Sequence, residues 1–213
     1  MNESRTYTYK VTSWPTNPDA STALEQYLRV RSAGQYATLG GAGLDFSGAD
    51  LHGVNLSEAY LAVANLDGTN LNNVDLNRAT LSGATMRRTN LSGAYMHKVE
   101  ADECEATSAD LSTANLFRAS FVKSDLRYAN LQDCQLSSTN FRQADLRNAN
   151  LQRCRFGPSP ARLSESQLFG ADITDATGDV RGPIHVTEAN ILAGAELEEW
   201  FAAHGAPNVR VVE

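Results

Sequence analysis

The sequence predicts an all-β solenoid whose chain winds as a polygonal coil, with a short helical cap at each end. Two observations carry this prediction. An apolar residue recurs at every fifth position from Phe46 to Phe156, and a second, mostly small series runs two positions earlier. A period of five fits neither a helix nor a half-buried strand. Side chains two apart on an extended segment point to the same side, so both series point inward. The next inward residue comes three positions after the apolar one, so the chain turns a corner in the two positions that follow it.

The residues between the inward pairs support this geometry. The chain contains units such as TANLF, YANLQ, QADLR and NANLQ, in which Asp or Asn separates the small residue from the apolar one. The two positions after the apolar residue are rich in Gly, Ser and Asn, which favour turns. Examples are Ser47-Gly48 and Ser82-Gly83. A short straight side followed by a corner, repeated along the chain, is therefore expected.

The A(D/N)Lxx unit resembles the signature of the pentapeptide-repeat family over residues 41–178. This resemblance implies a right-handed, four-sided (quadrilateral) β-helix with 20 residues per coil. Residues 20 apart should then stack, and about 6.5 coils at about 4.8 Å each give a rod of roughly 31 Å. The register breaks at 157–162, which we interpret as a two-residue insertion that bulges at a corner.

Residues 1–40 are expected to form the N-terminal cap of the rod, because a solenoid needs its ends covered. Alternation of residue types predicts a strand over residues 5–14. A helix is expected over 19–33, with Asp19 or Ser21 as N-cap, Leu24, Tyr27 and Leu28 on its buried face, and Gly34 as its stop.

Residues 179–213 form a second terminal segment, since Gly178 closes the repeat pattern. A helix over 195–204 would place Leu197, Trp200, Phe201 and His204 on one face, and a short strand is expected over 208–212. Two interpretations stay open for this face. It covers the last coil, or its residues Leu197, Trp200 and Phe201 form a tail-to-tail homodimer contact.

The three cysteines all fall in the small inward series, at Cys104, Cys134 and Cys154. We expect them to be buried, reduced thiols, since an inward position denies a nucleophile access and a base. Residues 1–14 show no apolar signal segment, and no apolar run approaches the length of a membrane helix. The expected compartment is therefore the cytoplasm.

Catalytic and cofactor motifs are not recognisable in the sequence. It contains no GxxxxGK[ST], HExxH or GxSxG, and its four histidines are scattered. Glu103 and Glu105 could imitate a glycosidase carboxylate pair, but an acidic surface patch is the simpler interpretation. We expect no enzyme activity, no metal and no cofactor.

The expected function is a non-catalytic protein-binding rod without direct nucleic-acid or membrane contact. The resemblance implies a specific form, a DNA-mimicking protein that binds DNA gyrase or topoisomerase IV and protects it from inhibitors. The alternative is a general scaffold or regulator that binds a different protein. The acidic side chains proposed as the partner surface are Asp45, Asp50, Glu58, Asp67, Asp75, Glu100, Asp102, Glu103, Glu105 and Asp110.

Charge supports duplex mimicry only in places. The whole chain has a net charge of −7, whereas residues 41–178 hold 16 acidic and 12 basic side chains, a net charge of −4. B-DNA carries about one charge per 1.7 Å, or roughly 18 over the expected length. Residues 41–77 hold five acids and no Lys or Arg. Basic residues are expected to stack in two columns, Arg78 with Lys98 and Arg118, and Arg127 with Arg147 above Arg87.

Overall fold

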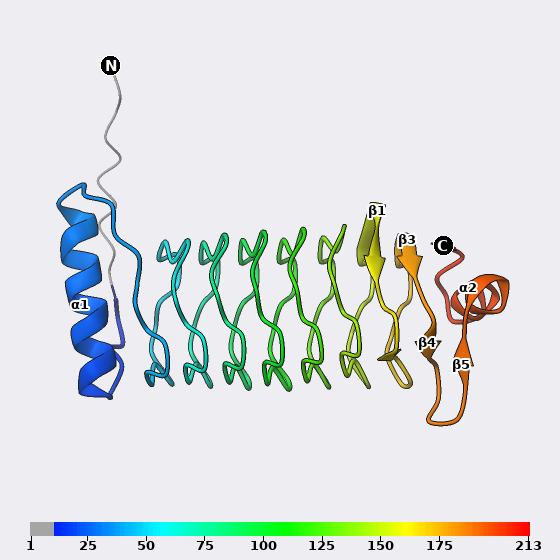
Figure 1. The fold of residues 1–213 in the computed structure, drawn as a ribbon, viewed down its shortest axis with the longest axis horizontal. Coiled ribbons are helices and arrows are strands. Elements are labelled where there is room, and N and C mark those ends of the chain that lie inside the picture. Colours follow the sequence, from blue (N-terminus) through cyan, green and yellow to red (C-terminus); the bar gives the residue numbers. More distant parts are fainter. Residues whose placement is uncertain (1–10) are drawn as a thin grey trace, which may run out of the picture.

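The computed structural model describes residues 11–213, and it shows a helix, a stack of coils and a second helix along one axis (Figure 1). The strand expected over residues 5–14 lies mostly outside the described residues. In its described part, Ser13 forms an antiparallel bridge with Asp50, whose backbone N–H donates to the Ser13 carbonyl at 2.8 Å. This contact attaches the start of the described chain to the first coils.

The coils are held together by parallel bridges between residues 20 apart. The bridges run from Gly40 and Tyr60 to Gln135 and Arg155, and they fall at every fifth residue, so four short sides make one turn. Each bridge is flanked by backbone hydrogen bonds between coils, such as that from Leu71 N–H to the Asn90 carbonyl at 2.7 Å. The predicted 20-residue coil is confirmed.

Both inward series fill the interior of the stack. Leu71, Leu91 and Leu131 are fully buried, as are nearly all residues of the small series. Phe121 and Phe141 stack on each other in adjacent coils with ring centroids 5.6 Å apart. The axis of the rod is therefore a continuous core of aliphatic, aromatic and alanine side chains.

The corners explain why Asp or Asn recurs in every unit. The side-chain oxygen of this residue accepts the backbone N–H two positions later, as Asp45 does from Ser47 at 2.9 Å. The turn that follows is closed by a backbone hydrogen bond, such as that from Ala49 N–H to the Phe46 carbonyl at 3.1 Å. Its third residue has positive φ in coil after coil, a conformation that glycine adopts most easily.

Polar residues of the small inward series have partners in the core. Thr139 donates its hydroxyl to the Leu116 carbonyl at 2.8 Å, and the thiols of Cys134 and Cys154 lie 2.9 Å and 3.0 Å from the carbonyls of Leu111 and Leu131. In each case the acceptor is the residue 23 positions earlier. All three cysteines are buried and free, as expected, and burial raises the pKa of Cys154 to about 12.

The N-terminal end is covered by α1 (Pro18–Ser32), which begins one residue earlier than predicted. Its buried face includes Leu24, Tyr27 and Leu28 as expected. The predicted N-caps Asp19 and Ser21 are wrong. Asn17 is the N-cap, and its side chain accepts the Ala20 N–H at 3.0 Å, because proline at position 18 suits the first helical turn and shifts the start of the helix.

The register break lies within a longer strand, β1 (Arg155–Arg162). Its pairing with β3 (Thr177–Arg181) has two register shifts, and bridge spacing increases from 20 to 22 residues at Asn140 and Arg162. The insertion is therefore taken up along an extended segment and not only at a corner. The next side of the coil contributes β2 (Ser166–Gln167).

Parallel pairing continues past Gly178, where the repeat pattern was expected to close. The two small sheets have the orders β1-β3-β6 and β2-β4-β5, formed with β4 (Ile184–His185), β5 (Ile191–Leu192) and β6 (Asn208–Val211). Val180 and Ile184 are fully buried, so apolar residues without the five-residue motif extend the core.

The last helix, α2 (Gly194–Ala203), covers this end of the core. Leu197 and Phe201 are fully buried within the chain itself, as expected of residues that cover the last coil. Trp200 is half-buried, and His204, expected on the same face, is exposed and stacks on Trp200. A homodimer contact at this face stays a prediction. Within residues 11–213, neither helix has the length and apolar character needed to cross a membrane.

Candidate protein-docking surface

With the interior filled, only the outer walls are available for recognition. Each wall consists of one five-residue side from every coil. Wall 1 starts at residues 40, 60, 80, 100, 120 and 140; wall 2 at 45, 65, 85, 105, 125 and 145; wall 3 at 50, 70, 90, 110, 130 and 150; and wall 4 at 55, 75, 95, 115, 135 and 155. The first, third and fourth residues of each side face outward.

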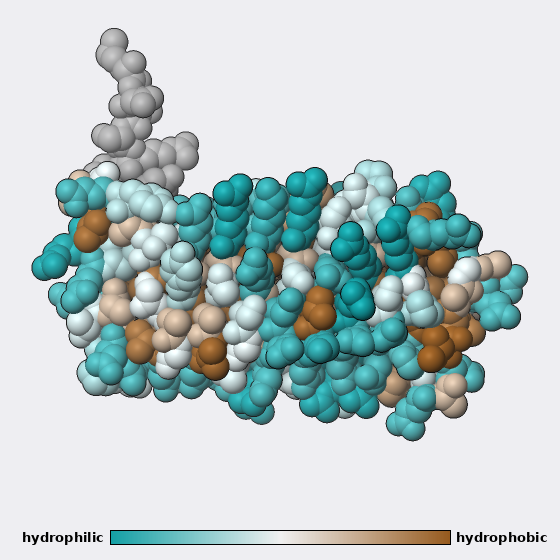
Figure 2. Space-filling view, viewed as in Figure 1, coloured by the Kyte–Doolittle hydropathy of each residue, from teal (hydrophilic) through white to brown (hydrophobic). Residues whose placement is uncertain are grey.

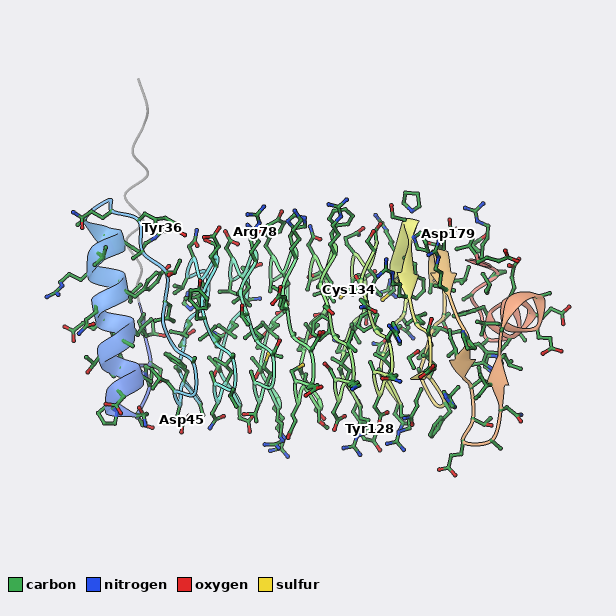
Figure 3. All side chains as sticks on the ribbon, in the orientation of Figure 1. Tyr36, Asp45, Arg78, Tyr128, Cys134 and Asp179 are labelled. Atoms are coloured by element: carbon green, nitrogen blue, oxygen red, sulfur yellow. The ribbon has the colours of Figure 1, made fainter. Side chains whose placement is uncertain are left out.

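The structure distributes the ten acidic residues proposed as a partner surface over all four walls. Glu100, Asp102 and Glu103 are on wall 1; Asp45, Asp67 and Glu105 on wall 2; Asp50 and Asp110 on wall 3; Glu58 and Asp75 on wall 4. Figure 3 shows Asp45 and Arg78 at opposite edges of the stack. Only Glu100, Asp102 and Glu103 gather on one side of one coil. The acidic residues therefore do not form a continuous stripe.

Several of these carboxylates already have partners. Asp50 accepts from the Asn70 amide at 2.8 Å and lies 2.8 Å from the His52 ring nitrogen. Asp102 accepts from the Ser120 hydroxyl at 2.5 Å, and Glu58 accepts from the Tyr36 hydroxyl. Hydrogen bonds from the Ser47 hydroxyl and backbone lower the pKa of Asp45. These carboxylates thus serve first to hold corners and neighbouring coils together.

Wall 2 carries charges of both signs, and most of them form ion pairs with one another. Arg87 pairs with Asp67 at 3.1 Å and also with Glu105. Arg127 pairs with Asp125 at 2.7 Å, and Arg147 pairs with Asp145 at 2.5 Å. The second predicted column of basic residues is therefore compensated by acids of its own wall.

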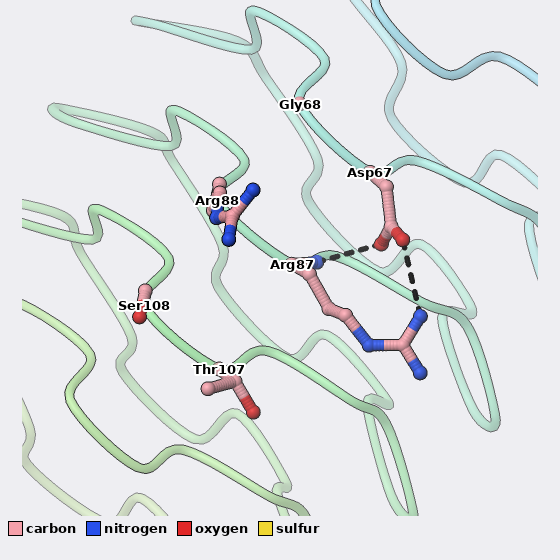
Figure 4. A pocket seen from close by; sticks show the side chains of 6 residues that line it. All are labelled: Asp67, Gly68, Arg87, Arg88, Thr107 and Ser108. Carbon is pink, nitrogen blue, oxygen red and sulfur yellow. Dashed lines mark hydrogen bonds and ion pairs between the residues drawn. The ribbon is translucent and has the colours of Figure 1, made fainter.

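A hollow of about 430 Å³ lies on wall 2, lined by Asp67, Gly68, Arg87, Arg88, Thr107 and Ser108 (Figure 4). These residues come from three successive coils. Arg87 is bonded to Asp67 across the hollow, as Figure 4 shows, whereas Arg88 has no ion pair among the described residues. The only carboxylate among the described residues of this lining, that of Asp67, is engaged by Arg87 through its backbone N–H and its guanidinium.

Wall 4 contains the other predicted basic column, Arg78, Lys98 and Arg118. The structure adds aromatic side chains that the sequence analysis missed. His97 and Phe117 stack almost parallel with ring centroids 5.4 Å apart, and the Arg118 guanidinium lies 5.0 Å from the centre of the Phe117 ring. The signal for these rings was present, since residues 97 and 117 share a wall position one coil apart.

Wall 1 is uncharged along its first three coils. Its outward positions there are glycine, alanine, serine and threonine together with Tyr60 and Val63, which are 61% and 69% exposed. Further apolar surface lies at the C-terminal end of the rod, where α2 and β5 lie in Figure 2; Ile191 of β5 is 53% exposed.

A family profile described as pentapeptide repeats matches the chain in eight copies, over residues 45–83, 75–112, 98–133 and 129–157. The chain is a pentapeptide-repeat protein. Members of this family fold as right-handed β-helices, which agrees with the stacked 20-residue coils. Among curated proteins, none matches the chain.

Solved structures of other pentapeptide-repeat proteins are similar to the chain at low identity. HetL of the cyanobacterium Nostoc sp. PCC 7120, involved in heterocyst differentiation regulation, is 23% identical; the match covers 76% of this chain and 90% of HetL, with a TM-score of 0.40. QnrB1, a plasmid-mediated fluoroquinolone resistance protein, is 18% identical over 81% of this chain and 84% of QnrB1, with a TM-score of 0.46.

A third similar structure is AT2G44920 from the Arabidopsis thaliana thylakoid lumen, which is 18% identical. The match covers 78% of this chain and 81% of that protein, with a TM-score of 0.27. Family membership indicates a fold and leaves function to the outer walls of this pentapeptide-repeat protein.

The described side chains also show which reactive or metal-binding groups the protein presents. Within residues 11–213 there is no group of three His, Cys, Asp or Glu side chains that could hold a metal ion. The three thiols have raised pKa values because they are buried. What the pentapeptide-repeat walls offer is a regular array of charged, amide and aromatic side chains on a rigid frame, which suits recognition of another macromolecule.

Proposed function

We propose that this pentapeptide-repeat protein is a non-catalytic rod that acts as a scaffold or regulator by binding a protein through one of its walls. The observation that carries the proposal is the pattern of charge on the walls. Wall 2 carries both signs and pairs them internally, wall 4 changes from acidic to basic along its length, and the start of wall 1 carries no charge. Mosaic surfaces of this kind favour a specific partner, because complementary charges select partners and fix register.

Site-specific cross-linking tests this proposal. Tyr60, Tyr95 and Tyr128 are exposed tyrosines on walls 1, 4 and 2, so each can be replaced by photoreactive p-benzoylphenylalanine with little change in shape. In cells that naturally make the protein, we expect one wall to give a discrete covalent adduct with a single protein, identified by mass spectrometry. Diffuse labelling from all three probed walls, or no adduct from any of them, would contradict binding through walls 1, 2 or 4.

A second candidate is a duplex mimic that binds DNA gyrase or topoisomerase IV and protects it from inhibitors. It is favoured by the first coils, where residues 41–77 hold five acids and no Lys or Arg. The distribution of acids over four walls weakens it, because B-DNA presents its phosphates as continuous rows.

Purified gyrase and topoisomerase IV test this second candidate. A duplex mimic would inhibit supercoiling or rescue the enzyme from a quinolone, and the triple variant Asp45→Asn, Glu58→Gln and Asp75→Asn would lose the effect. Asn at positions 45 and 75 can still accept the corner N–H bonds that Asp45 and Asp75 accept. If the wild-type protein neither inhibits nor rescues either enzyme, duplex mimicry is wrong and the scaffold proposal is unaffected.

A further inference from the structure

The basic column on wall 4 is built by consecutive coils. Bridges from Asp75 to Tyr95 and from Tyr95 to Asn115 place Arg78, Lys98 and Arg118 one coil apart, or about 4.8 Å per step. All three occupy the same corner position, with φ of 58°, 57° and 59°. Their backbone N–H groups each donate to the next coil, as Arg78 does to the His97 carbonyl at 2.9 Å. Their side chains therefore leave the wall side by side.

The column makes no ion pair of its own among the described residues, although Glu58 holds the same corner position one coil before Arg78 and accepts from the Tyr36 hydroxyl. None of the three side chains forms an ion pair with a described residue, whereas Arg87, Arg127, Arg147 and Arg153 all do. Asp75 is on the same wall, and its carboxylate accepts the Asn77 N–H at 2.9 Å. His97 lies among the three cations, and its pKa is lowered by burial and then by the charges of Lys98, Arg118 and Arg78.

Like charges on facing positions of neighbouring strands repel, so the column costs stability that a ligand of opposite charge would recover. The ligand must be anionic, and the aromatic side chains indicate its class. Phe117 stacks on His97 and also contacts the Arg118 guanidinium, so its ring is already engaged. Single-stranded nucleic acid binding depends on open aromatic faces for its bases, which the engaged ring of Phe117 does not provide.

We propose that the column of Arg78, Lys98 and Arg118 binds an acidic segment of a partner protein, with aspartate or glutamate carboxylates spread along the three cations. This rests on the proposed function as a protein-binding rod and names the chemistry of the partner. Guanidinium and ammonium groups on a fixed frame form charge-assisted hydrogen bonds with carboxylates. The contact between Arg118 and Phe117 holds one of these groups in place before binding.

Fluorescence anisotropy at low ionic strength tests the inference with three labelled probes: oligoglutamate, oligoglutamine and oligothymidylate. We expect the full-length protein to bind oligoglutamate in preference to both others. The triple variant Arg78→Gln, Lys98→Gln and Arg118→Gln should bind it at least about tenfold more weakly. Salt should weaken wild-type binding, since the contacts are exposed.

The matched control is the triple variant Arg88→Gln, Lys123→Gln and Arg142→Gln. It changes net charge by the same amount, and none of its three residues forms an ion pair with a described residue. Arg88 and Lys123 also occupy the same corner position as the column, with φ of 55° and 57°. We expect less than about a threefold loss from this control. Thermal melting verifies that both variants stay folded.

Three results would overturn the inference: an equal loss in both triple variants, tighter binding of oligothymidylate than of oligoglutamate, or no binding of oligoglutamate by the wild type. Failure here is distinct from failure of the proposed function. If oligoglutamate does not bind while a wall still cross-links to a discrete protein, the rod binds a partner by other means. If oligoglutamate binds and no wall cross-links, the column is confirmed as an acidic-segment site and the scaffold role is wrong.

Discussion

At the residue scale, the corner position with positive φ is the most demanding place in each unit. Most side chains pay a steric penalty there, and β-branched residues are the least suited. Val63 nevertheless has φ of 58° and is 69% exposed, so its side chain adds little burial in return. Its backbone N–H donates to the Ser82 carbonyl at 2.9 Å, which glycine would preserve.

We therefore expect Val63→Gly to raise the free energy of unfolding by about 1 kcal/mol, because relief of the left-handed strain exceeds the entropy cost of glycine. Urea denaturation followed by circular dichroism measures the change. The control is Ala62→Gly in the same turn, at a position without positive φ, which should lower stability by roughly 0.5 kcal/mol. A loss of stability in both variants would show that corner strain is not a significant cost.

Residue roles were predictable where the periodicity determines direction. The burial of Cys104, Cys134 and Cys154 followed from their inward register, and so did the structural role of the Asp and Asn positions. The partners of charged side chains were not predictable in the same way. Arg87 reaches Asp67 and Glu105 in the coils on either side, and such choices depend on rotamers that a five-residue period leaves open.

At the element scale, the caps decide how each end of the stack meets water. Helix α1 covers the first coil with Leu24 and Leu28, and Asn17 satisfies an N–H at its start. The sequence predicted the start of this helix to within one residue, but it did not identify the N-cap. Asn, Asp and Ser are about equally common as N-caps, and Pro18 in the first helical turn is what places the cap at Asn17. The β-strands after Gly178 lack the motif, so their pairing could not be read from it.

We predict that Asn17→Ala destabilises α1 by about 1 kcal/mol, whereas Ser21→Ala is neutral or slightly stabilising because alanine is the better helix former. Since each coil contacts only its neighbours, the effect should stay local. Hydrogen exchange should speed up at amides of α1 and of the first coil, such as Gly41, and stay unchanged near Leu131. Equal effects of the two substitutions would mean that Asn17 is not the operative cap.

At the scale of the whole molecule, carboxylates tie the stability of the rod to pH. Hydrogen bonds lower the pKa values of Asp45, Asp50, Asp125 and Asp172 in the folded state. Stability from these groups is complete above the ordinary aspartate pKa of about 3.9, and it is lost as pH falls through their lower folded values.

The melting temperature should therefore fall steeply below about pH 4. In the double variant Asp45→Asn and Asp172→Asn, the fall should be shallower, because an amide oxygen can still accept the corner N–H but no longer titrates. Melting followed by circular dichroism between neutral and acidic pH measures both curves. An unchanged slope in the double variant would place the acid sensitivity elsewhere in the protein.

The fold as a whole was predictable because one short period determines every inward side chain and every stacked column, whereas the ion pairs between charges on the walls required the structure. The 20-residue coil has a last consequence. Each added coil lengthens the rod by about 4.8 Å. Outward side chains at the same position of successive coils are therefore spaced at regular intervals of this length along a wall. Deleting one complete 20-residue coil would shorten the distance between two outward side chains on the same wall by one such interval and would leave both side chains on that wall.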